Sequence, residues 1–219
     1  MKSVGLRLRP AEGAFPGVDE ALAGIPGVTR EGIQHLEWLA DGTYAMLYRV
    51  SGGGEAAIGE VLTTHDEVLQ HDVVSAGADQ YYVFVNVAEQ ESVSALLRIL
   101  DEHRLLLDPP LRVTDDGLCV TVAGDGDALQ AAFADVTQVE VPIEVEWTGG
   151  YRPGEPAALS RLTDRQREAL EAAHELGFYE TPREASFEDI GEALSCSPST
   201  ANELLRRAEA RVVSSLLDG

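Results

Sequence analysis

Cysteine, lysine and long apolar runs are all scarce in this 219-residue chain. The two cysteines, Cys119 and Cys196, lie in apolar segments, so we expect buried thiols and not a disulfide framework. No segment approaches the roughly 20 apolar residues of a membrane-spanning helix, and the N-terminal stretch lacks the apolar core of a signal peptide. These absences argue against a secreted disulfide-rich domain and an integral membrane protein, and we expect a cytoplasmic protein.

Basic charge is scarce as well, because 16 Lys and Arg stand against 38 Asp and Glu, and Lys2 is the only lysine. An acidic, lysine-poor surface is typical of proteins from a salt-rich cytoplasm, where carboxylates hold water and cations and salt screens their repulsion. Residues 1–156 carry nine basic and 26 acidic residues, whereas residues 157–219 carry seven and 12. We therefore expect a halophilic protein whose excess acid lies mostly in the first part of the chain.

Patterns that would indicate catalysis or metal binding are missing. The five histidines are scattered, and no spacing of Cys, His or carboxylates matches a zinc or calcium site. No serine or cysteine has a recognisable base partner. The glycines Gly52 to Gly54 lie between strand-like segments with no following helix or lysine expected, so we interpret them as a hairpin turn and not as a phosphate loop. We expect no enzyme activity, no cofactor and no metal.

A helix-turn-helix pattern begins at Ser186. Ser186, with Asp189 three residues later, is typical of a helix N-terminus. Gly191 lies where two crossing helices must approach closely, and Ser195 occupies a turn position that often carries glycine. Cys196 can turn inward between the helices. The expected buried side chains of this first helix are Ile190, Ala193 and Leu194.

A second helix is predicted to follow. Ser197 can cap it, and Pro198 would occupy its first position, where a missing N–H costs nothing. The apolar tail that includes Val213 and Leu217 either seals the domain core or forms a dimer seam, and we favour the core role. The stripe expected to face the core comprises Ala201, Leu204, Leu205, Ala208, Val212 and Leu216.

The opposite face of the second helix has side chains suited to reading base edges. Asn pairs with adenine, Arg with guanine, Glu accepts from cytosine, and Ser serves several partners, while nearby arginines can contact phosphates. The alternative is an ordinary helical hairpin with a solvated polar face, but the agreement of caps, proline and turn favours DNA binding. The candidate DNA-binding residues are Arg183, Ser197, Ser199, Thr200, Asn202, Glu203, Arg206, Arg207 and Arg211.

A third helix is predicted upstream of this motif. Thr163 and Gln166 form a capping box, and Gly177 is placed to end the helix. Three helices with a shared core suffice for a small DNA-binding domain. The buried stripe expected on this helix comprises Ala169, Leu170, Ala173 and Leu176.

Residues 162–212 resemble the helix-turn-helix domain of the haloarchaeal bacterio-opsin-activator (Bat-like) transcriptional regulators. The resemblance rests on LTxRQ at 162–166, GFY at 177–179, PRE at 182–184 and LLRRAEA at 204–210. More loosely, the segments THDEVLQHDV and DDGLCVTVAGDGDALQAAF are similar to the domain that accompanies this module in the family. The resemblance implies a sequence-specific regulator whose partner is double-stranded DNA.

The first part of the chain predicts an α+β fold, namely a mixed or antiparallel sheet covered on one face, with a βαββαβ run as one arrangement. Helices are expected over Ser92–Arg104 and Asp127–Ala134. A small all-α domain follows it. The strands are expected where Val4, Leu6 and Leu8 alternate with polar residues, and over Tyr44–Val50, Tyr81–Val87, Leu118–Ala123 and Val139–Trp147.

Gly and Pro gather in TGGYRPGEPAA, which predicts a domain boundary. We predict an α+β sensory or dimerisation domain over 1–150, a linker over 151–158 and a helix-turn-helix domain over 159–219. The leading function is a homodimeric transcriptional regulator, with a small-molecule effector of unspecified class sensed by the first domain. The alternatives are a sigma-factor-like promoter-recognition module, against which the composition argues, and a protein-interaction adaptor without DNA binding.

Overall fold

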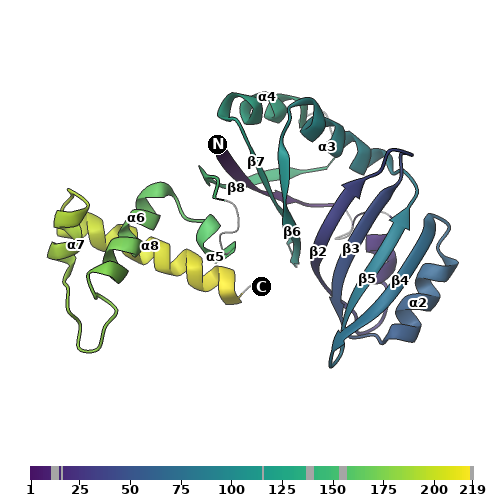
Figure 1. The fold of residues 1–219 in the computed structure, drawn as a ribbon, viewed down its shortest axis with the longest axis horizontal. Helices are drawn as coiled ribbons and strands as arrows, with labels where there is room; N and C mark the ends of the chain where they lie inside the picture. The colour runs from purple at the N-terminus through teal and green to yellow at the C-terminus, as the bar shows by residue number, and fades with distance from the viewer. Residues whose placement is uncertain (11–14, 16, 115, 137–140, 153–156, 218–219) are drawn as a thin grey trace. The chain divides into compact units, whose positions relative to one another are not determined.

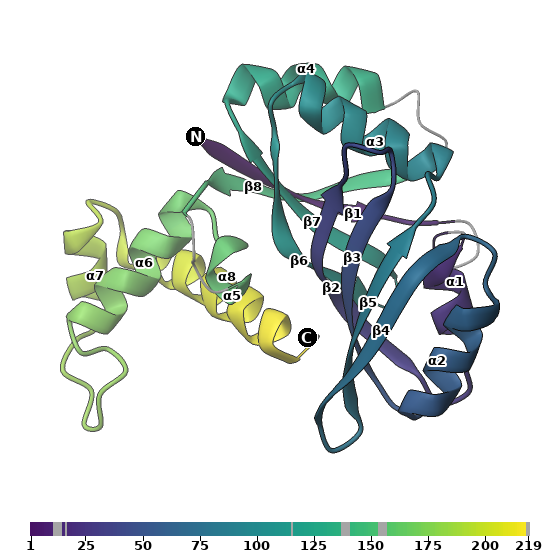
Figure 2. The ribbon, with the colours of Figure 1, turned by 45° about the vertical axis from the view of Figure 1, so that its right-hand side comes forward.

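Two compact units make up the chain, residues 4–146 and residues 1–3 with 147–219. The computed structural model describes residues 1–10, 15, 17–114, 116–136, 141–152 and 157–217. Figure 1 shows the helices and strands, and Figure 2 shows them from a second direction. Each unit has a hydrophobic core of its own.

The N-terminal fold is built on one eight-stranded sheet. The strands are β1 (Lys2–Leu8), β2 (Thr29–Trp38), β3 (Tyr44–Ser51), β4 (Val68–Gly77), β5 (Gln80–Val87), β6 (Leu106–Thr114), β7 (Gly117–Gly124) and β8 (Ile143–Gly150). Their order across the sheet is β4-β5-β3-β2-β6-β7-β1-β8. The ladders β2–β3, β3–β5, β4–β5, β2–β6 and β6–β7 are antiparallel. The predicted α+β class is confirmed.

The predicted βαββαβ run occurs twice. The first run is β1-α1-β2-β3-α2-β4 and the second is β5-α3-β6-β7-α4-β8. Each half of the sheet takes three strands from one run and its remaining strand from the other. In the half β4-β5-β3-β2 the borrowed strand is β5, and in the half β6-β7-β1-β8 it is β1. The two runs are therefore interlocked in a single fold.

Four helices contribute to the core against the sheet, namely α1 (Val18–Ala23), α2 (Glu55–Thr64), α3 (Glu91–Glu102) and α4 (Gly126–Val136). In β3, burial alternates strictly along the strand, so that Tyr44, Met46 and Tyr48 lie on the core side. Ile58 and Leu62 of α2, one helical turn apart, belong to the same apolar cluster. Figure 2 shows α3 beside α4 and α1 beside α2.

The predicted hairpin turn at Gly52 to Gly54 is wrong. These glycines, all with positive φ, lead from β3 directly into α2, and Gly54 is the N-cap residue. A Cβ on Gly52 would lie 1.8 Å from the carbonyl oxygen of Gly27, so this backbone passes too close to a neighbouring loop for any other residue. Further elements absent from the sequence prediction are β2, β4, β6 and α1.

The smaller unit contains α5 (Ala157–Ser160), α6 (Asp164–Glu175), α7 (Phe187–Ala193) and α8 (Pro198–Leu217). Its core includes Ala173, Ile190, Ala201 and Leu205. In the proposed linker 151–158, residues 153–156 lie outside the described residues, as do residues 139 and 140 of the strand expected over Val139–Trp147.

Four expected core positions in the helical unit are instead exposed. Leu176, which is 39% exposed, follows the end of α6, and the left-handed turn at Gly177 places Phe178 in the core in its stead. Ala193 lies on the outer side of the last turn of α7, since Ile190 and Leu194 make the inward contacts. Val213 is 51% exposed and Leu216 is 67% exposed, because α8 continues beyond the three-helix core. The core role expected for this apolar tail is therefore wrong at both positions.

Candidate nucleic-acid interface

The first helix of the motif, α7, begins with the predicted capping box. The hydroxyl of Ser186 accepts hydrogen bonds from the backbone N–H groups of Glu188 and Asp189, and the Asp189 carboxylate accepts from the Ser186 N–H at 2.7 Å. The Ser186 hydroxyl also donates to this carboxylate, and these hydrogen bonds hold the pKa of Asp189 below its usual value. The charged cap is therefore present at neutral pH and is lost as the pH falls through that lowered pKa. The predicted N-terminus is confirmed.

The turn between α7 and α8 packs directly on α7. A Cβ on Gly191 would lie 2.8 Å from the carbonyl oxygen of Cys196, so only glycine lets the turn approach this closely. The N–H of Cys196 donates to the carbonyl oxygen of Gly191 at 2.8 Å, and the Cys196 side chain packs on the helical core. The expected close approach at Gly191 is confirmed, and it fixes the direction in which α8 leaves the turn.

Ser195 adopts a left-handed backbone conformation, with φ of +53°. This conformation costs an L-residue about 1–2 kcal/mol, which glycine avoids, although glycine also loses more entropy on folding. We therefore expect Ser195→Gly to raise the free energy of unfolding by about 0.5–1 kcal/mol. Denaturation in molar KCl, followed by circular dichroism, measures the change.

A matched control for this substitution lies within α8. Ser214 is exposed in the body of that helix, where Ser214→Gly is expected to destabilise by a few tenths of a kcal/mol to about 1 kcal/mol. Destabilisation by both substitutions would show that contacts made by the serine side chain offset the cost of the left-handed backbone at Ser195.

The second helix, α8, starts as predicted at Pro198, with Ser197 as its cap. The Ser197 hydroxyl accepts from the Thr200 N–H at 3.2 Å and lies 2.9 Å from the Ser199 hydroxyl and 2.8 Å from that of Thr200. All three hydroxyls are exposed. They gather at the helix N-terminus, where free N–H groups and the helix dipole favour an anionic group such as a phosphate.

One face of α8 is buried and the opposite face is open. Ala201, Leu205 and Ala208 are almost fully buried. At 3.6 residues per turn, the positions directly opposite them are Ser199, Glu203 and Arg206, and these side chains are exposed. Asn202 is half-buried, on the border between the two faces. Arg207 lies on the other border and is exposed.

The candidate arginines differ in the contacts that their guanidinium groups make. Arg207 forms an ion pair with Glu203, one turn away on the same helix. Arg183 is exposed and stacks over the ring of Phe178, with 4.0 Å between the guanidinium carbon and the ring centroid. Within the described part of the chain, Arg206 forms no ion pair. A new contact made by Arg206 would therefore break no ion pair among these residues.

Arg211 points into the helical unit. Its guanidinium donates to the side-chain oxygen of Gln166 at 2.6 Å and to the carbonyl oxygen of Arg161 at 3.3 Å. Gln166 also completes the predicted capping box of α6 with Thr163. Arg211 therefore ties the middle of α8 to the start of α6, which gives it a structural role.

The loop between α6 and α7, which carries Arg183, is anchored where it leaves α6. At Gly177, where φ is +77°, the Phe178 N–H donates to the carbonyl oxygen of Ala173, which ends α6 as predicted. The Tyr179 hydroxyl donates to the Glu209 carboxylate of α8 at 2.8 Å. Burial, followed by this hydrogen bond to Glu209, raises the pKa of Tyr179. The loop is thereby held against α8.

Sequence reasoning missed Arg165. Its guanidinium donates to the carbonyl oxygen of Leu194, at the C-terminal end of α7, at 3.2 Å, and it also pairs with Glu168 at 2.6 Å. A cation at a helix C-terminus satisfies a free carbonyl and complements the helix dipole. Only the i, i+3 spacing of Arg165 and Glu168 was visible in the sequence, and it gave no hint of the contact with α7.

Over the described ranges, no group of three or more His, Cys, Asp or Glu side chains could hold a metal ion. No helix in those ranges combines the length and apolarity needed to cross a membrane.

Two family models match the chain. The HVO_0513 N-terminal domain family matches residues 17–151, which is more than half of the chain. The family described as the HTH DNA binding domain matches residues 162–214. The second match covers all of α6 and α7 and most of α8.

Similar curated proteins come from haloarchaea. A Haloferax volcanii protein provisionally named a transcriptional regulator is 29% identical over 203 residues, which is 89% of this chain and 32% of that protein. The transcriptional regulator NarO of the same organism is 46% identical over 57 residues, covering 26% of this chain and 27% of that protein. The bacterioopsin transcriptional activator of Halobacterium salinarum is 25% identical over 170 residues, which is 74% of this chain and 24% of that protein.

The chain spans about a third or less of the length of these relatives. The match over 17–151 places its larger unit in the HVO_0513 N-terminal domain family, and the match over 162–214 identifies the helical unit as a DNA-binding domain. The chain therefore belongs to the HVO_0513 N-terminal domain family, carries a helix-turn-helix DNA-binding domain after it, and is similar to haloarchaeal transcriptional regulators such as the bacterioopsin activator.

Proposed function

We propose that this protein is a sequence-specific DNA-binding transcriptional regulator, in which α8 enters the major groove. The observation that carries the proposal is the open face of α8, set at a fixed angle by the Gly191 contact in a helix-turn-helix with both helix caps in place. A helix of this kind reads base edges with residues near its N-terminus. DNA lies in the cytoplasm of an archaeal cell, and we place the protein there.

The residues of the interface divide by role. Ser199, Glu203 and Arg206 face the base edges, and Asn202 reaches them from the border of the face. The hydroxyls of Ser197 and Thr200, together with Arg183 and Arg207, contact phosphates. Arg211 is expected to act indirectly, by holding α8 on α6. The full set proposed to touch DNA is Arg183, Ser197, Ser199, Thr200, Asn202, Glu203, Arg206 and Arg207.

The first domain supplies sensing or assembly and not catalysis. It occupies residues 1–150 in our proposal, and the linker 151–158 joins it to the helix-turn-helix domain over 159–219. This division lets a signal received by the sheet domain alter how the DNA-binding helices are presented. The adaptor and sigma-factor-like alternatives have no observation in their favour.

A competition gel shift with the full chain in molar potassium salt tests the proposal. A preferred site is first selected from a pool of random duplexes, and is then competed with unlabelled copies of itself and of scrambled sequence. We expect the selected site to compete at least a thousandfold better than scrambled DNA, which is the lower end of specificity for such proteins. Equal competition by both duplexes, or no binding, would favour the adaptor.

We expect the protein to bind DNA as a homodimer. One helix-turn-helix contacts too few base pairs for genomic specificity, and dimers read half-sites one helical turn apart. The end of α8 offers an apolar surface for the dimer contact, the α8 seam, since Val213 is 51% exposed and Leu216 is 67% exposed. Light scattering in molar KCl is expected to give twice the 23.5 kDa mass of the chain.

The variant Leu216→Glu separates two ways of forming this dimer. Conversion to monomer would place the contact at the α8 seam, whereas a persistent dimer would place it in the sheet domain. A wild-type monomer, both alone and with DNA carrying two half-sites, would contradict the dimer.

A further inference from the structure

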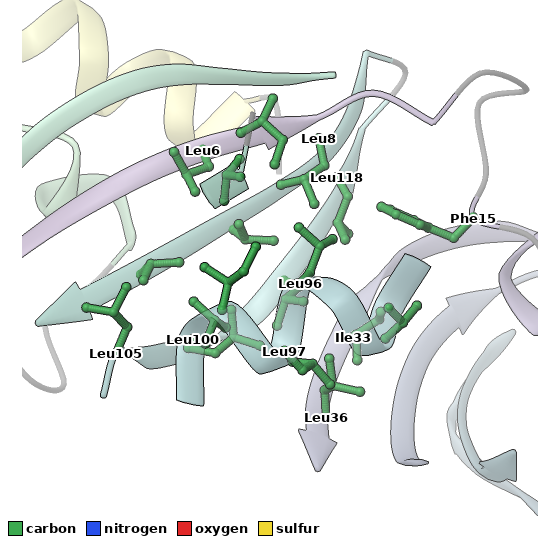
Figure 3. A pocket seen from close by; sticks show the side chains of 18 of the residues that line it. Leu6, Leu8, Phe15, Ile33, Leu36, Leu96, Leu97, Leu100, Leu105 and Leu118 are labelled. Carbon is green, nitrogen blue, oxygen red and sulfur yellow. The ribbon is translucent and has the colours of Figure 1, made fainter. Parts of the chain in front are cut away.

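The larger unit contains an apolar cavity between its sheet and its helices. The centre of a water molecule can occupy about 130 Å³ of it, and the cavity is partly open to solvent. Figure 3 shows Leu96, Leu97 and Leu100 of α3 on one side of this space and side chains such as Leu6 of β1 and Leu118 of β7 on the other. Lining residues from α1, α4 and other strands complete the walls.

This cavity is too large to be ordinary packing space. Protein interiors contain few voids larger than one water molecule. A cavity of about 150 Å³ lined by Leu, Ile and Phe stays dry and is large enough to bind benzene. The walls here are of the same kind, and the opening gives a small molecule a route inward. The cavity therefore has room for a molecule with a body about the size of one benzene ring.

The apolar face of α3 is incompletely covered by the rest of the fold. Val93, Leu96, Leu97 and Leu100 recur at the spacing of one helix face, and all four line the cavity. Each of them remains partly exposed, whereas Ile99 of the same helix is buried. Removing such apolar surface from water is favourable. The cavity thus offers an apolar ligand a wall made mostly of leucine.

Almost no polar atom faces the cavity. Of the described residues that line it, only Asp19, Tyr48 and Gln90 carry oxygen or nitrogen in their side chains. Asp19 accepts from the Phe15 N–H at 2.9 Å and from Arg30 at 2.6 Å through Oδ2, and its Oδ1 is closed off even to water. The Asp19 carboxylate therefore does not open into the cavity.

The other two polar side chains of the lining are also engaged within the protein. The Tyr48 hydroxyl donates to the Met46 sulfur at 3.8 Å, and Tyr48 as a whole is only 2% exposed. The Gln90 amide donates at 2.6 Å to the carboxylate of Glu67, which does not belong to the lining. A ligand in the cavity therefore meets carbon and sulfur almost everywhere among these residues.

We propose that this cavity binds a small neutral molecule without hydrogen-bonding groups, a hydrocarbon or halogenated hydrocarbon of about one ring. A polar group on the ligand would leave water and find no partner in these walls, and a charged group would be costlier still. An apolar ligand avoids this cost and covers the partly exposed leucines of α3. The proposal names the class of effector for the first domain, and in that respect it rests on the proposed sensing role. The site itself lies within residues 4–146 and does not need DNA.

Calorimetric titration of the full chain in molar KCl, without DNA, tests the site. Toluene and phenol are the main probes, because they have nearly the same size and differ only by a methyl group in place of a hydroxyl. We expect toluene to bind at least tenfold more tightly than phenol, since the phenol hydroxyl would be left without a partner. Benzoate and benzylamine, which are charged at neutral pH, are expected not to bind. No binding of toluene up to its solubility limit, or equal affinity for toluene and phenol, would overturn the proposal.

A variant that fills the cavity locates the binding. Ala132 lies on α4 in the cavity wall, and Ala132→Leu is expected to weaken toluene binding at least tenfold by occupying its space. Ala131→Leu, at an exposed position on the same helix, is the matched control and is expected to leave toluene binding unchanged. Equal affinity of the two variants for toluene would place the binding outside the cavity and contradict the proposal.

A second variant changes the polarity of the wall and keeps its volume. Val120→Thr, on β7 in the lining, replaces a methyl group with a hydroxyl of nearly the same size. It is expected to narrow the ratio of toluene to phenol affinity about fivefold, because phenol gains a hydrogen-bonding partner in the wall. An unchanged ratio in this variant would overturn the assignment of the cavity as the binding site.

The ligand site and DNA recognition are tested independently, because the titrations contain no DNA. Circular dichroism checks that each variant folds, and the comparison of toluene with phenol on the unmodified chain remains decisive if neither variant folds. Toluene binding by a chain that gives no gel shift would support the site and contradict only the DNA-binding function. A chain that gives the gel shift and binds no toluene would contradict only the site.

Discussion

Replacing Arg206 with alanine is expected to weaken binding to the preferred DNA site by about 1–3 kcal/mol and to relax base preference at one position. Arg206 is exposed, lies opposite the buried Ala201–Leu205–Ala208 face, and forms no ion pair within the described chain. Its guanidinium is therefore free to make two hydrogen bonds to a guanine edge. Fluorescence anisotropy with the selected site and with its single-base variants measures both effects.

The control for Arg206→Ala is Arg98→Ala. Arg98 lies on α3 and is similarly exposed, so its loss changes the net charge equally without touching α8. It is expected to leave the affinity almost unchanged. Asn202→Ala is expected to lie in the lower part of the same 1–3 kcal/mol range, because Asn202 is half-buried at the border of the face. An equal loss on every DNA sequence would show that Arg206 contacts only phosphate.

The affinity for DNA is expected to depend weakly on potassium salt, or to rise with it, between sub-molar and molar concentrations. Each phosphate that a protein neutralises releases counterions, which makes affinity fall as salt rises, but few arginines here are available to do so. Exposed carboxylates such as Glu203 must take up cations to lie beside phosphates. That uptake opposes the release, so the two contributions are expected to offset each other.

Removing salt is expected to unfold the protein. The chain carries a net charge of -22, and the Debye length grows from about 3 Å at 1 M to about 30 Å at 0.01 M, so carboxylate repulsion then acts across the whole molecule. Circular dichroism over the same salt range measures folding alongside affinity. A steep fall in affinity with rising salt, in a protein that stays folded throughout, would contradict both expectations.

The variant Glu203→Gln tests the cause of the weak salt dependence. It keeps the shape of the side chain, removes one carboxylate from the face and releases Arg207 from its ion pair. We expect the plot of log affinity against log salt to become steeper by about one unit, because one cation is no longer taken up and one more arginine is free. An unchanged slope would place the cation uptake away from α8.

The helical domain was predicted almost residue by residue because its signals are local. Capping boxes at Thr163 and Ser186, the proline that opens α8 and the glycine that ends α6 each act within a few residues of the chain. Errors arose where packing decided the outcome, as at Leu176, which Phe178 displaces from the core. The inward hydrogen bonds of Arg211 had no local signal either.

The sheet was predicted less completely, because some strands break the usual patterns. β6 contains Pro109 and Pro110, residues that argue against a strand, but they lie where the pairing with β7 skips from Asp108 to Arg112. β2 has two such irregularities, so its apolar residues do not alternate. Each of them pairs with the next strand along the chain, but the two also pair with each other across a long separation in sequence.

The sequence by itself determined the class of the protein, the caps and turn of its helix-turn-helix, and the acidic composition suited to high salt, since these follow from local chemistry and from counting residues. Only the tertiary structure decided that two βαββαβ runs exchange strands, and that Arg206 forms no ion pair among the described residues while Arg211 is hydrogen-bonded to Gln166. It alone revealed an apolar cavity in the larger unit. The reason is physical: burial and hydrogen-bond partnership depend on contacts between residues far apart in the chain, which no local pattern records.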